Sequence, residues 1–185
     1  MKQPAAQSTD AIDEIRAGWA GRRPELDTSA IDIVGRVLRA SALVVRSTEQ
    51  RLAEHDLSRG EFDVLTTLRR TGDPQSPTTL RTIGLASAAA ITKRVHALER
   101  RGLVARAANP ADRRGTLIAL TPAGAELVDR AFPEVLAVER ELLAQVPADL
   151  LAEATRSLRA VLASVEAAQM PRPGRRPGAT VDPWA

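Results

Sequence analysis

The chain has 185 residues, enough for one ordinary domain with extensions. Hydrophobic residues make up 44% of it but aromatic residues only 2%, so we expect an aliphatic core and, given many good helix formers, a mostly α fold. The absence of cysteine excludes disulfides, thiolate metal sites and thiol redox switches. No apolar run approaches the roughly 18 residues of a membrane span, and the beginning of the chain has no apolar signal core. We therefore expect a cytoplasmic protein with no membrane partner.

Positive charge is concentrated in one part of the chain. The net charge of the whole is only +3, although the isoelectric point is about 10.4. Residues 81–114 contain eight Lys or Arg and two acids, which leaves +6, so the remainder is net acidic. A local basic patch on a nearly balanced protein predicts that one face binds a polyanion.

The first half of the chain predicts two helices of unequal length. A short helix is expected to begin after Asp10, which is a typical N-cap, and to carry Trp19 in its apolar stripe. A much longer helix is expected to begin at Thr28 or Ser29, either of which could be its N-cap, and to run to about His55. Its length suggests a scaffold or a pairing helix.

Two further helices are predicted before the basic region. Ser58 and Glu61 form the pattern of a capping box, and the helix behind them should end at Gly72. Because proline is favoured at the first helical position, a short helix should begin at Pro77, and Gly84 should end it.

The central predicted element is a basic helix that Ser87 caps and Gly102 terminates. At 1.5 Å a residue its length is roughly 20 Å, which suits the major groove of DNA. The helical repeat places Ile91, Val95 and Leu98 on one buried stripe. The opposite face is polar and basic. It is expected to face outward, while Arg94 lies on the flank, nearer the buried stripe than Lys93.

A β-hairpin is predicted next, from residues 103–107 and 116–120, with the basic loop 109–115 between them. The helix that follows should begin at Thr121 and Pro122, and Pro133 is expected to kink or split it. Pro147 should open the last helix. We expect the polar start of the chain and the tail from residue 171 to be disordered.

A capped basic helix followed by a basic hairpin is typical of a winged helix-turn-helix that binds double-stranded DNA. Basic side chains can pair with phosphates and with guanine edges in the major groove, and wing arginines can reach the backbone or the minor groove. A solvated basic surface and a winged-helix module for protein assembly are the alternatives. The candidate DNA contacts are Ser87, Ala89, Thr92, Lys93, His96, Arg100, Arg113 and Arg114.

No residue pattern in the sequence indicates another kind of functional site. The two histidines, His55 and His96, have no partners at ligand spacing, so no metal site is expected. No nucleophile–base set or phosphate loop occurs, so we expect neither an enzyme nor a cofactor. Five segments are predicted: a flexible start with a first helix (1–25), a dimerisation helix (26–57), the winged helix-turn-helix (58–121), C-terminal dimerisation helices (122–170) and a disordered tail (171–185).

The order of parts resembles the MarR family of regulators, most specifically in the wing sequence NPADRR at 109–114 and in LTPAG at 120–124. The resemblance implies an obligate homodimer with interleaved terminal helices that binds a pseudo-palindromic operator, most often as a repressor. It also implies that Asp112 supports the wing by holding one arginine. We expect that arginine to be Arg114, with Arg113 free for DNA, although the two assignments could be exchanged.

Residues 13–19, 23–27 and 60–65 also resemble the urate-responsive branch of that family, which has an additional N-terminal helix with a Trp. This resemblance implies a small anionic effector, either urate, another purine, or an acid like trans-aconitate or citrate. Two guanidiniums can hold a planar anion and an indole can stack on it. In the alternative interpretation, the Trp only packs the first helix, the Asp is a surface acid or ion-pair partner, and the wing-base Arg only braces the wing. The implied ligand-binding residues are Trp19, Asp63, Arg94 and Arg106.

Overall fold

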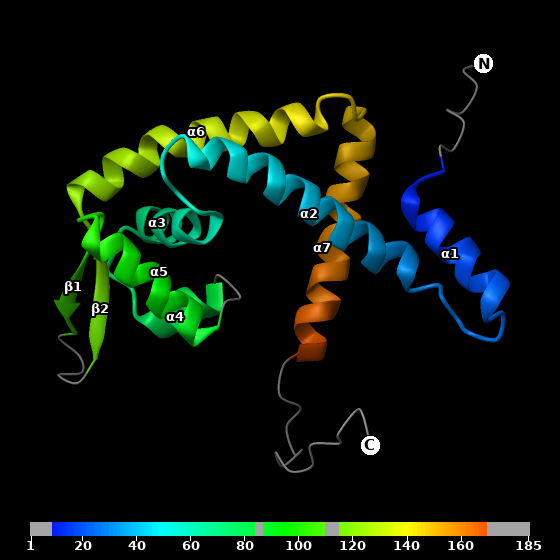
Figure 1. Cartoon of the computed structure of the whole chain (residues 1–185), viewed down its shortest axis with the longest axis horizontal. Helices are drawn as coiled ribbons and strands as arrows, with labels where there is room; N and C mark the ends of the chain where they lie inside the picture. Colours follow the sequence, from blue (N-terminus) through cyan, green and yellow to red (C-terminus); the bar gives the residue numbers. More distant parts are fainter. Residues whose placement is uncertain (1–8, 84–86, 110–114, 170–185) are drawn as a thin grey trace, which may run out of the picture. The chain divides into compact units, whose positions relative to one another are not determined.

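The computed structural model describes residues 9–83, 87–109 and 115–169 (Figure 1). In these ranges the chain forms seven helices and one two-stranded antiparallel sheet, and the expectation of a mostly α winged helix-turn-helix is confirmed. The elements in order are α1 (Ala11–Arg22), α2 (Ile31–Ala53), α3 (Arg59–Thr71), α4 (Pro77–Ile83), α5 (Ala88–Arg100), β1 (Val104–Ala108), β2 (Thr116–Leu120), α6 (Pro122–Leu143) and α7 (Ala148–Gln169). The predictions for the two ends of the chain fall outside the described residues. So do the predictions for Gly84, Asp112, Arg113 and Arg114.

The first helix begins as expected, but the beginning of the second was wrongly assigned. Asp10 caps α1, with its carboxylate accepting from the N–H groups of Ile12 and Asp13. Helix α2 begins after Ala30, which makes no side-chain cap. The backbone carbonyls of Thr28 and Ser29 accept from the first N–H groups of α2 instead. The backbone carbonyls of the turn before α2 thus accept from its first N–H groups, which is the role that we expected of a side-chain cap.

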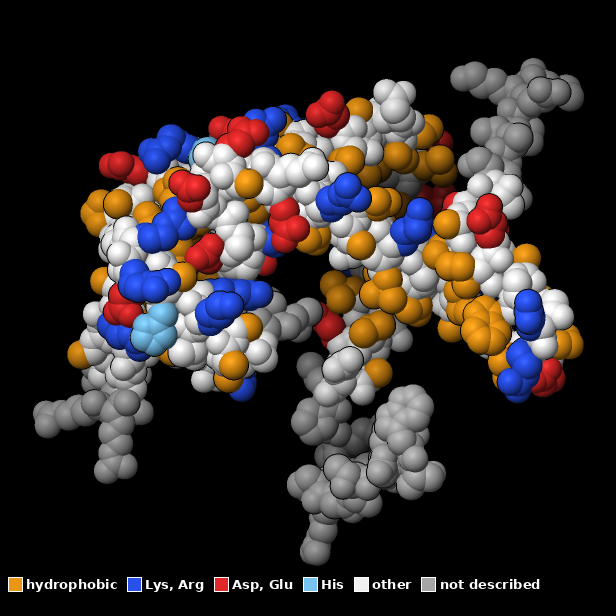
Figure 2. Space-filling view, viewed as in Figure 1, with side chains coloured by type: hydrophobic (Ala, Val, Ile, Leu, Met, Phe, Trp, Pro, Cys, Tyr) orange, Lys and Arg blue, Asp and Glu red, His pale blue; other side chains and the backbone are white. Residues whose placement is uncertain are grey.

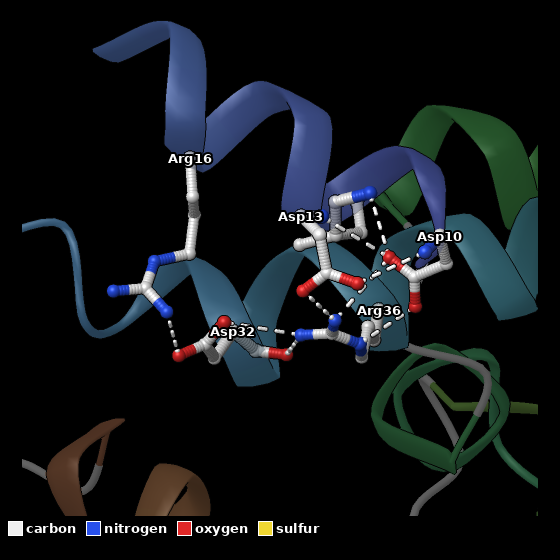
Figure 3. A network of polar contacts seen from close by, with 6 residues as sticks. Asp10, Asp13, Arg16, Asp32 and Arg36 are labelled. Atoms are coloured by element: carbon white, nitrogen blue, oxygen red, sulfur yellow. Dashed lines mark hydrogen bonds and ion pairs between the residues drawn. The ribbon is translucent and has the colours of Figure 1, made fainter. Parts of the chain in front are cut away.

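A polar network joins α1 to α2 (Figure 3). The guanidinium of Arg36 on α2 binds the carboxylates of Asp10 (Nε to Oδ2, 2.8 Å), Asp13 (Nη2 to Oδ1, 2.7 Å) and Asp32 (Nη1 to Oδ1, 3.1 Å). Asp32 also pairs with Arg16 of α1. Beside the network, Ile12 is buried against Gly35, where a Cβ atom would lie 3.1 Å from the Ile12 Cδ1 atom.

The middle of the chain forms the core. Helix α3 begins with the predicted capping box of Ser58 and Glu61 and ends at Gly72, whose φ is +75°. Its Phe62, Leu65 and Leu68 are buried, as are residues from the end of α2 and from α4, α5, both strands and α6. In Figure 1, α3, α4, α5 and the hairpin therefore form one group.

The hairpin begins one residue later than predicted, at Val104, because Leu103 is used in the turn after α5. Val104 lies opposite Leu120 and Arg106 lies opposite Ile118. The sequence did not indicate a further backbone bridge, in which Gln75 and Ile118 exchange N–H to carbonyl bonds of 2.9 and 2.8 Å. This bridge ties the beginning of α4 to the wing.

Pro133 does not split α6, which runs without a break from Pro122 to Leu143. Proline removes one helical hydrogen bond. However, the buried residues Val128, Ala131 and Val135 lie on both sides of it and anchor one helix to the core. Outside the core, Arg69 of α3 also holds the carboxylate of Asp129 through two bonds of 2.8 Å.

The chain divides into two compact units after Leu142, and α7 belongs to the second. No residue of α7 is buried, and its exposed large hydrophobic residues include Leu150, Leu158, Leu162 and Val165. Among the described residues, no helix is long and apolar enough to cross a membrane.

Candidate nucleic-acid interface

Helix α5 is held so that one face is buried and the other is open to solvent. The Ser87 hydroxyl accepts from the N–H of Ala90 at 3.2 Å. Ile91, Val95 and Leu98 are at most 2% exposed, which confirms the predicted buried stripe. The chain leaves the helix through Gly102, whose φ of +68° is a left-handed conformation that favours glycine.

The open face of α5 carries the basic residues that were predicted to contact DNA. Lys93, His96 and Arg100 are all exposed, as are Ala89 and Thr92. Figure 2 shows Lys and Arg side chains, with one histidine among them, gathered over the surface that α4 and α5 form. The Thr92 hydroxyl donates to the Ala88 carbonyl at 3.0 Å. Its hydrogen therefore points to the helix backbone, and its oxygen can still accept a hydrogen bond. This face can therefore pair with phosphates and base edges.

Glu99 connects the open face to the wing. Its Oε2 accepts from Nε of Arg106 on β1 at 3.1 Å and lies 3.7 Å from Nδ1 of His96. The spacing of His96 and Glu99 along one helix was visible in the sequence. The ion pair between Glu99 and Arg106 could not be seen in the sequence, because it depends on how the hairpin folds back beside α5. Arg106 therefore braces the base of the wing in this structure.

Arg101 counts toward the basic patch in the sequence but has a structural partner. Its Nη1 donates to the Asp56 carbonyl at 2.6 Å, and its Nη2 donates to the His55 carbonyl at 3.4 Å. Asp56 has a φ of +54°, so the guanidinium binds a tight turn between α2 and α3. The imidazole of His55 meanwhile contacts Glu134 of α6, with Nε2 and Oε2 3.1 Å apart.

The four residues assigned to an anion site lie on four different elements. Trp19 is 47% exposed and lines a shallow surface hollow whose other residues all belong to α1. Arg106 is paired with Glu99, and Asp63 accepts from Nε of Arg59 at 2.9 Å. Among the described contacts, none joins Trp19 to Asp63, Arg94 or Arg106.

Arg94 lies where the helical repeat placed it, half-buried on the flank of α5. It packs on the first turn of α3, with its guanidinium over Gly60. Within the described part of the chain, Arg94 forms no hydrogen bond or ion pair. One turn further along α3 is Asp63, so the structure brings two of the four predicted residues, Arg94 and Asp63, to neighbouring positions.

Arg59 is a residue that sequence reasoning missed. It binds Asp63, its Nη1 donates to the hydroxyl of the fully buried Thr48 at 3.2 Å, and its guanidinium carbon lies 5.8 Å from the centre of the Phe62 ring. The i, i+4 spacing of Arg59 and Asp63 is a helical ion-pair signal and could have indicated it. No group of three or more acidic or His side chains suited to a metal occurs among the described residues.

Comparisons with known proteins agree on one family. The sequence model of the MarR family matches residues 55–115. The chain is 32% identical over 157 residues to the HTH-type transcriptional regulator PecS of Dickeya dadantii, covering 84% of this chain and 92% of PecS.

Two solved structures share the fold and some of the sequence. A mutant of MarR from E. coli complexed with operator DNA is 27% identical, with a TM-score of 0.65, covering 74% of this chain and 99% of that one. CouR from Rhodococcus jostii, bound to p-coumaroyl-CoA, is 25% identical, with a TM-score of 0.63, covering 73% of this chain and 95% of that one.

Proposed function

This chain belongs to the MarR family and is a DNA-binding transcriptional regulator, and we propose that it acts as a homodimeric repressor whose DNA binding is attenuated by a small anion. The observation that carries the proposal is the open face of α5, where Lys93, His96 and Arg100 are exposed on a helix whose opposite face is buried in the core.

We propose that α5 enters the major groove of a pseudo-palindromic operator. The complex of the E. coli relative with operator DNA supports this use of the fold. Lys93 and Arg100 would contact phosphates or guanine edges, and His96 lies between them on the same face. Ser87, Ala89 and Thr92 complete the proposed α5 surface, and the wing arginines, Arg113 and Arg114, with Asp112 as support, extend the proposal to a flanking groove.

A salt titration of operator binding tests this proposal. The dissociation constant for the chain's own promoter region is measured by gel shift at several salt concentrations. Four phosphate contacts predict a log–log slope of about −3.6. Lys93→Ala and Arg100→Ala should each weaken binding and reduce the slope by about 1. Arg130→Ala, which removes an exposed arginine of α6 outside this face, is the control. A slope near zero for the wild type would exclude DNA binding and favour a winged-helix module for protein assembly.

The homodimer is supported by apolar surface that one chain leaves uncovered. Figure 2 shows hydrophobic side chains along α1 and α7, and the whole of α7 lacks a buried residue. Large exposed apolar patches mark interaction surfaces. We propose that the terminal helices of two chains cover one another.

The anion response is proposed from Arg94, with Trp19, Asp63 and Arg106 as its partners. Arg94 is a half-buried guanidinium for which the described residues provide no anionic partner, and it lies on the helix that reads DNA. The structure of CouR with p-coumaroyl-CoA supports small-molecule binding within this fold. Because no described contact joins Trp19 or Arg106 to Arg94, we propose that the anion draws them together.

Thermal shift with urate, xanthine, trans-aconitate and citrate tests the response. An anion at 100 times its dissociation constant should stabilise the protein by about 2.7 kcal/mol. Arg94→Ala should remove the shift, and Arg130→Ala should keep it. If none of the four anions changes the Tm of the wild type or releases the operator, the chain is a regulator without this anion response.

A further inference from the structure

Arg94 occupies a place that glycine at position 60 leaves open. A Cβ atom built on Gly60 would lie 2.1 Å from Nε, 2.3 Å from Cζ and 2.6 Å from Nη2 of Arg94. Real Cβ atoms do not approach other atoms so closely. All three nearest atoms belong to the guanidinium, so the group faces the backbone of Gly60 rather than touching it with one tip. Guanidiniums are weakly hydrated and pack well in this way.

No polar partner among the described residues explains where Arg94 lies. Both acids in the first turns of α3 have other partners: Glu61 accepts from the Ser58 N–H at 2.9 Å, and Asp63 is bound by Arg59, with 2.9 Å between Nε and Oδ1. Arg59 is itself anchored to the Thr48 hydroxyl at 3.2 Å, so this pair is fixed from two sides. Packing on Gly60 is therefore the contact that directs the Arg94 guanidinium toward α3 and away from the open face that carries Lys93.

We infer that Gly60 is a positioning residue for the anion response, because the absence of a Cβ atom at this position leaves room for the Arg94 guanidinium on the inner flank of α5. The inference rests on the proposed role of Arg94 in anion binding. Alanine at position 60 would displace the guanidinium without altering Arg94 itself. The atoms that must move are the far end of a flexible side chain, so the backbone of α3 can stay in place. Alanine also suits a helix better than glycine.

The experiment compares Gly60→Ala with Arg94→Ala and with Gly21→Ala in the full-length protein. Gly21 is a matched control, since it also lies in a helix and a Cβ atom there would meet nothing within 4 Å. The four anions named above serve as probes, with thermal shift and operator release as readouts. The Nε–Hε resonance of Arg94 in a ¹⁵N-labelled sample, assigned by its loss in Arg94→Lys, reports the position of the guanidinium without any ligand.

Gly60→Ala is expected to keep or raise the Tm, to move the Arg94 resonance, and to lose the anion response as Arg94→Ala does. Gly21→Ala should keep both the resonance and the response. An unmoved resonance in Gly60→Ala would overturn the inference, and so would a wild-type anion response in that variant when Arg94→Ala has none. A wild type that ignores all four anions would overturn the proposed anion response instead, and the resonance would still decide where Gly60 places Arg94.

Discussion

Single arginines in this chain serve different purposes that their residue type does not reveal. Arg100 is exposed on the open face of α5, whereas the next residue, Arg101, binds the carbonyls of a turn at the end of α2. Arg94 packs on Gly60, and Arg59 holds Asp63. A count of positive charge predicts that DNA is bound, but only the structure shows which guanidiniums have partners within the protein.

At the same scale, the Arg36 network should make the attachment of α1 depend on pH. Hydrogen bonds from the Asp10 N–H and from Arg36 hold the pKa of Asp13 below its ordinary value, and bonds from Arg16 and Arg36 lower the pKa of Asp32. Carboxylates of lowered pKa stabilise the folded protein above the unfolded pKa of about 3.9, and this stability is lost as pH falls through the folded pKa.

The Tm, followed by circular dichroism, should therefore fall as the pH is lowered below about 4, toward the lowered pKa values that these carboxylates have in the folded protein. Arg36→Gln should make this dependence shallower, because it removes a partner of three carboxylates at once. Arg39→Gln, an exposed neighbour on α2 with no ion pair among the described residues, should behave as the wild type. Parallel curves for wild type and Arg36→Gln would show that the network does not control this titration.

At the scale of elements, helix beginnings are specified in two ways in this chain. The Ser58 hydroxyl accepts from the Glu61 N–H at 3.3 Å, while Glu61 accepts from the Ser58 N–H at 2.9 Å. Helix α2, by contrast, follows a turn and has Ala30 at its N-cap. The free energy of unfolding should therefore depend on the capping side chain of α3 but not on the side chains at the beginning of α2.

Ser58→Ala is expected to lower the free energy of unfolding by about 1 kcal/mol, because it removes a capping bond. Thr28→Ala, at the position predicted but not used as a cap, should change it by less than about 0.5 kcal/mol. Urea unfolding followed by circular dichroism measures both. Equal losses in the two variants would mean that Thr28 stabilises the beginning of α2 in a way the observed bonds do not include.

At the scale of the whole molecule, the uncovered apolar stripe of α7 should control assembly. Leu158 and Leu162 are 52% and 56% exposed and lie one turn apart on the same face. Leu158→Glu combined with Leu162→Glu would place charges in the proposed interface, where they lack partners. Light scattering should then report a monomer, and operator affinity should fall because two reading helices are no longer linked.

Arg156→Glu is the control, since position 156 lies on the opposite face of α7 and is exposed. It should leave the dimer intact. A double variant that remains dimeric at the same protein concentration would place the interface elsewhere in the chain.

Local signals in the sequence determined most of the secondary structure. Asp10, Ser58, Ser87 and the glycines at 72 and 102 act on the backbone within one turn, so their effects follow from a few neighbouring residues. Apolar periodicity assigned the buried stripe of α5 for the same reason. At Pro133, where a kink or a split was predicted, the helix is not split, because packing of both halves against the core outweighs one lost hydrogen bond.

Only the tertiary structure decided which side chains share a partner. The contacts of Arg94 with Gly60, of Arg101 with the Asp56 carbonyl and of Arg59 with Thr48 join residues that are 34, 45 and 11 positions apart. No periodicity predicts such contacts, because they depend on how separate helices are brought together by a common core. The sequence by itself therefore determined the elements and the basic character of one face, and the packing of α3 against α5 decided that Arg94 lies over Gly60 and not on that face.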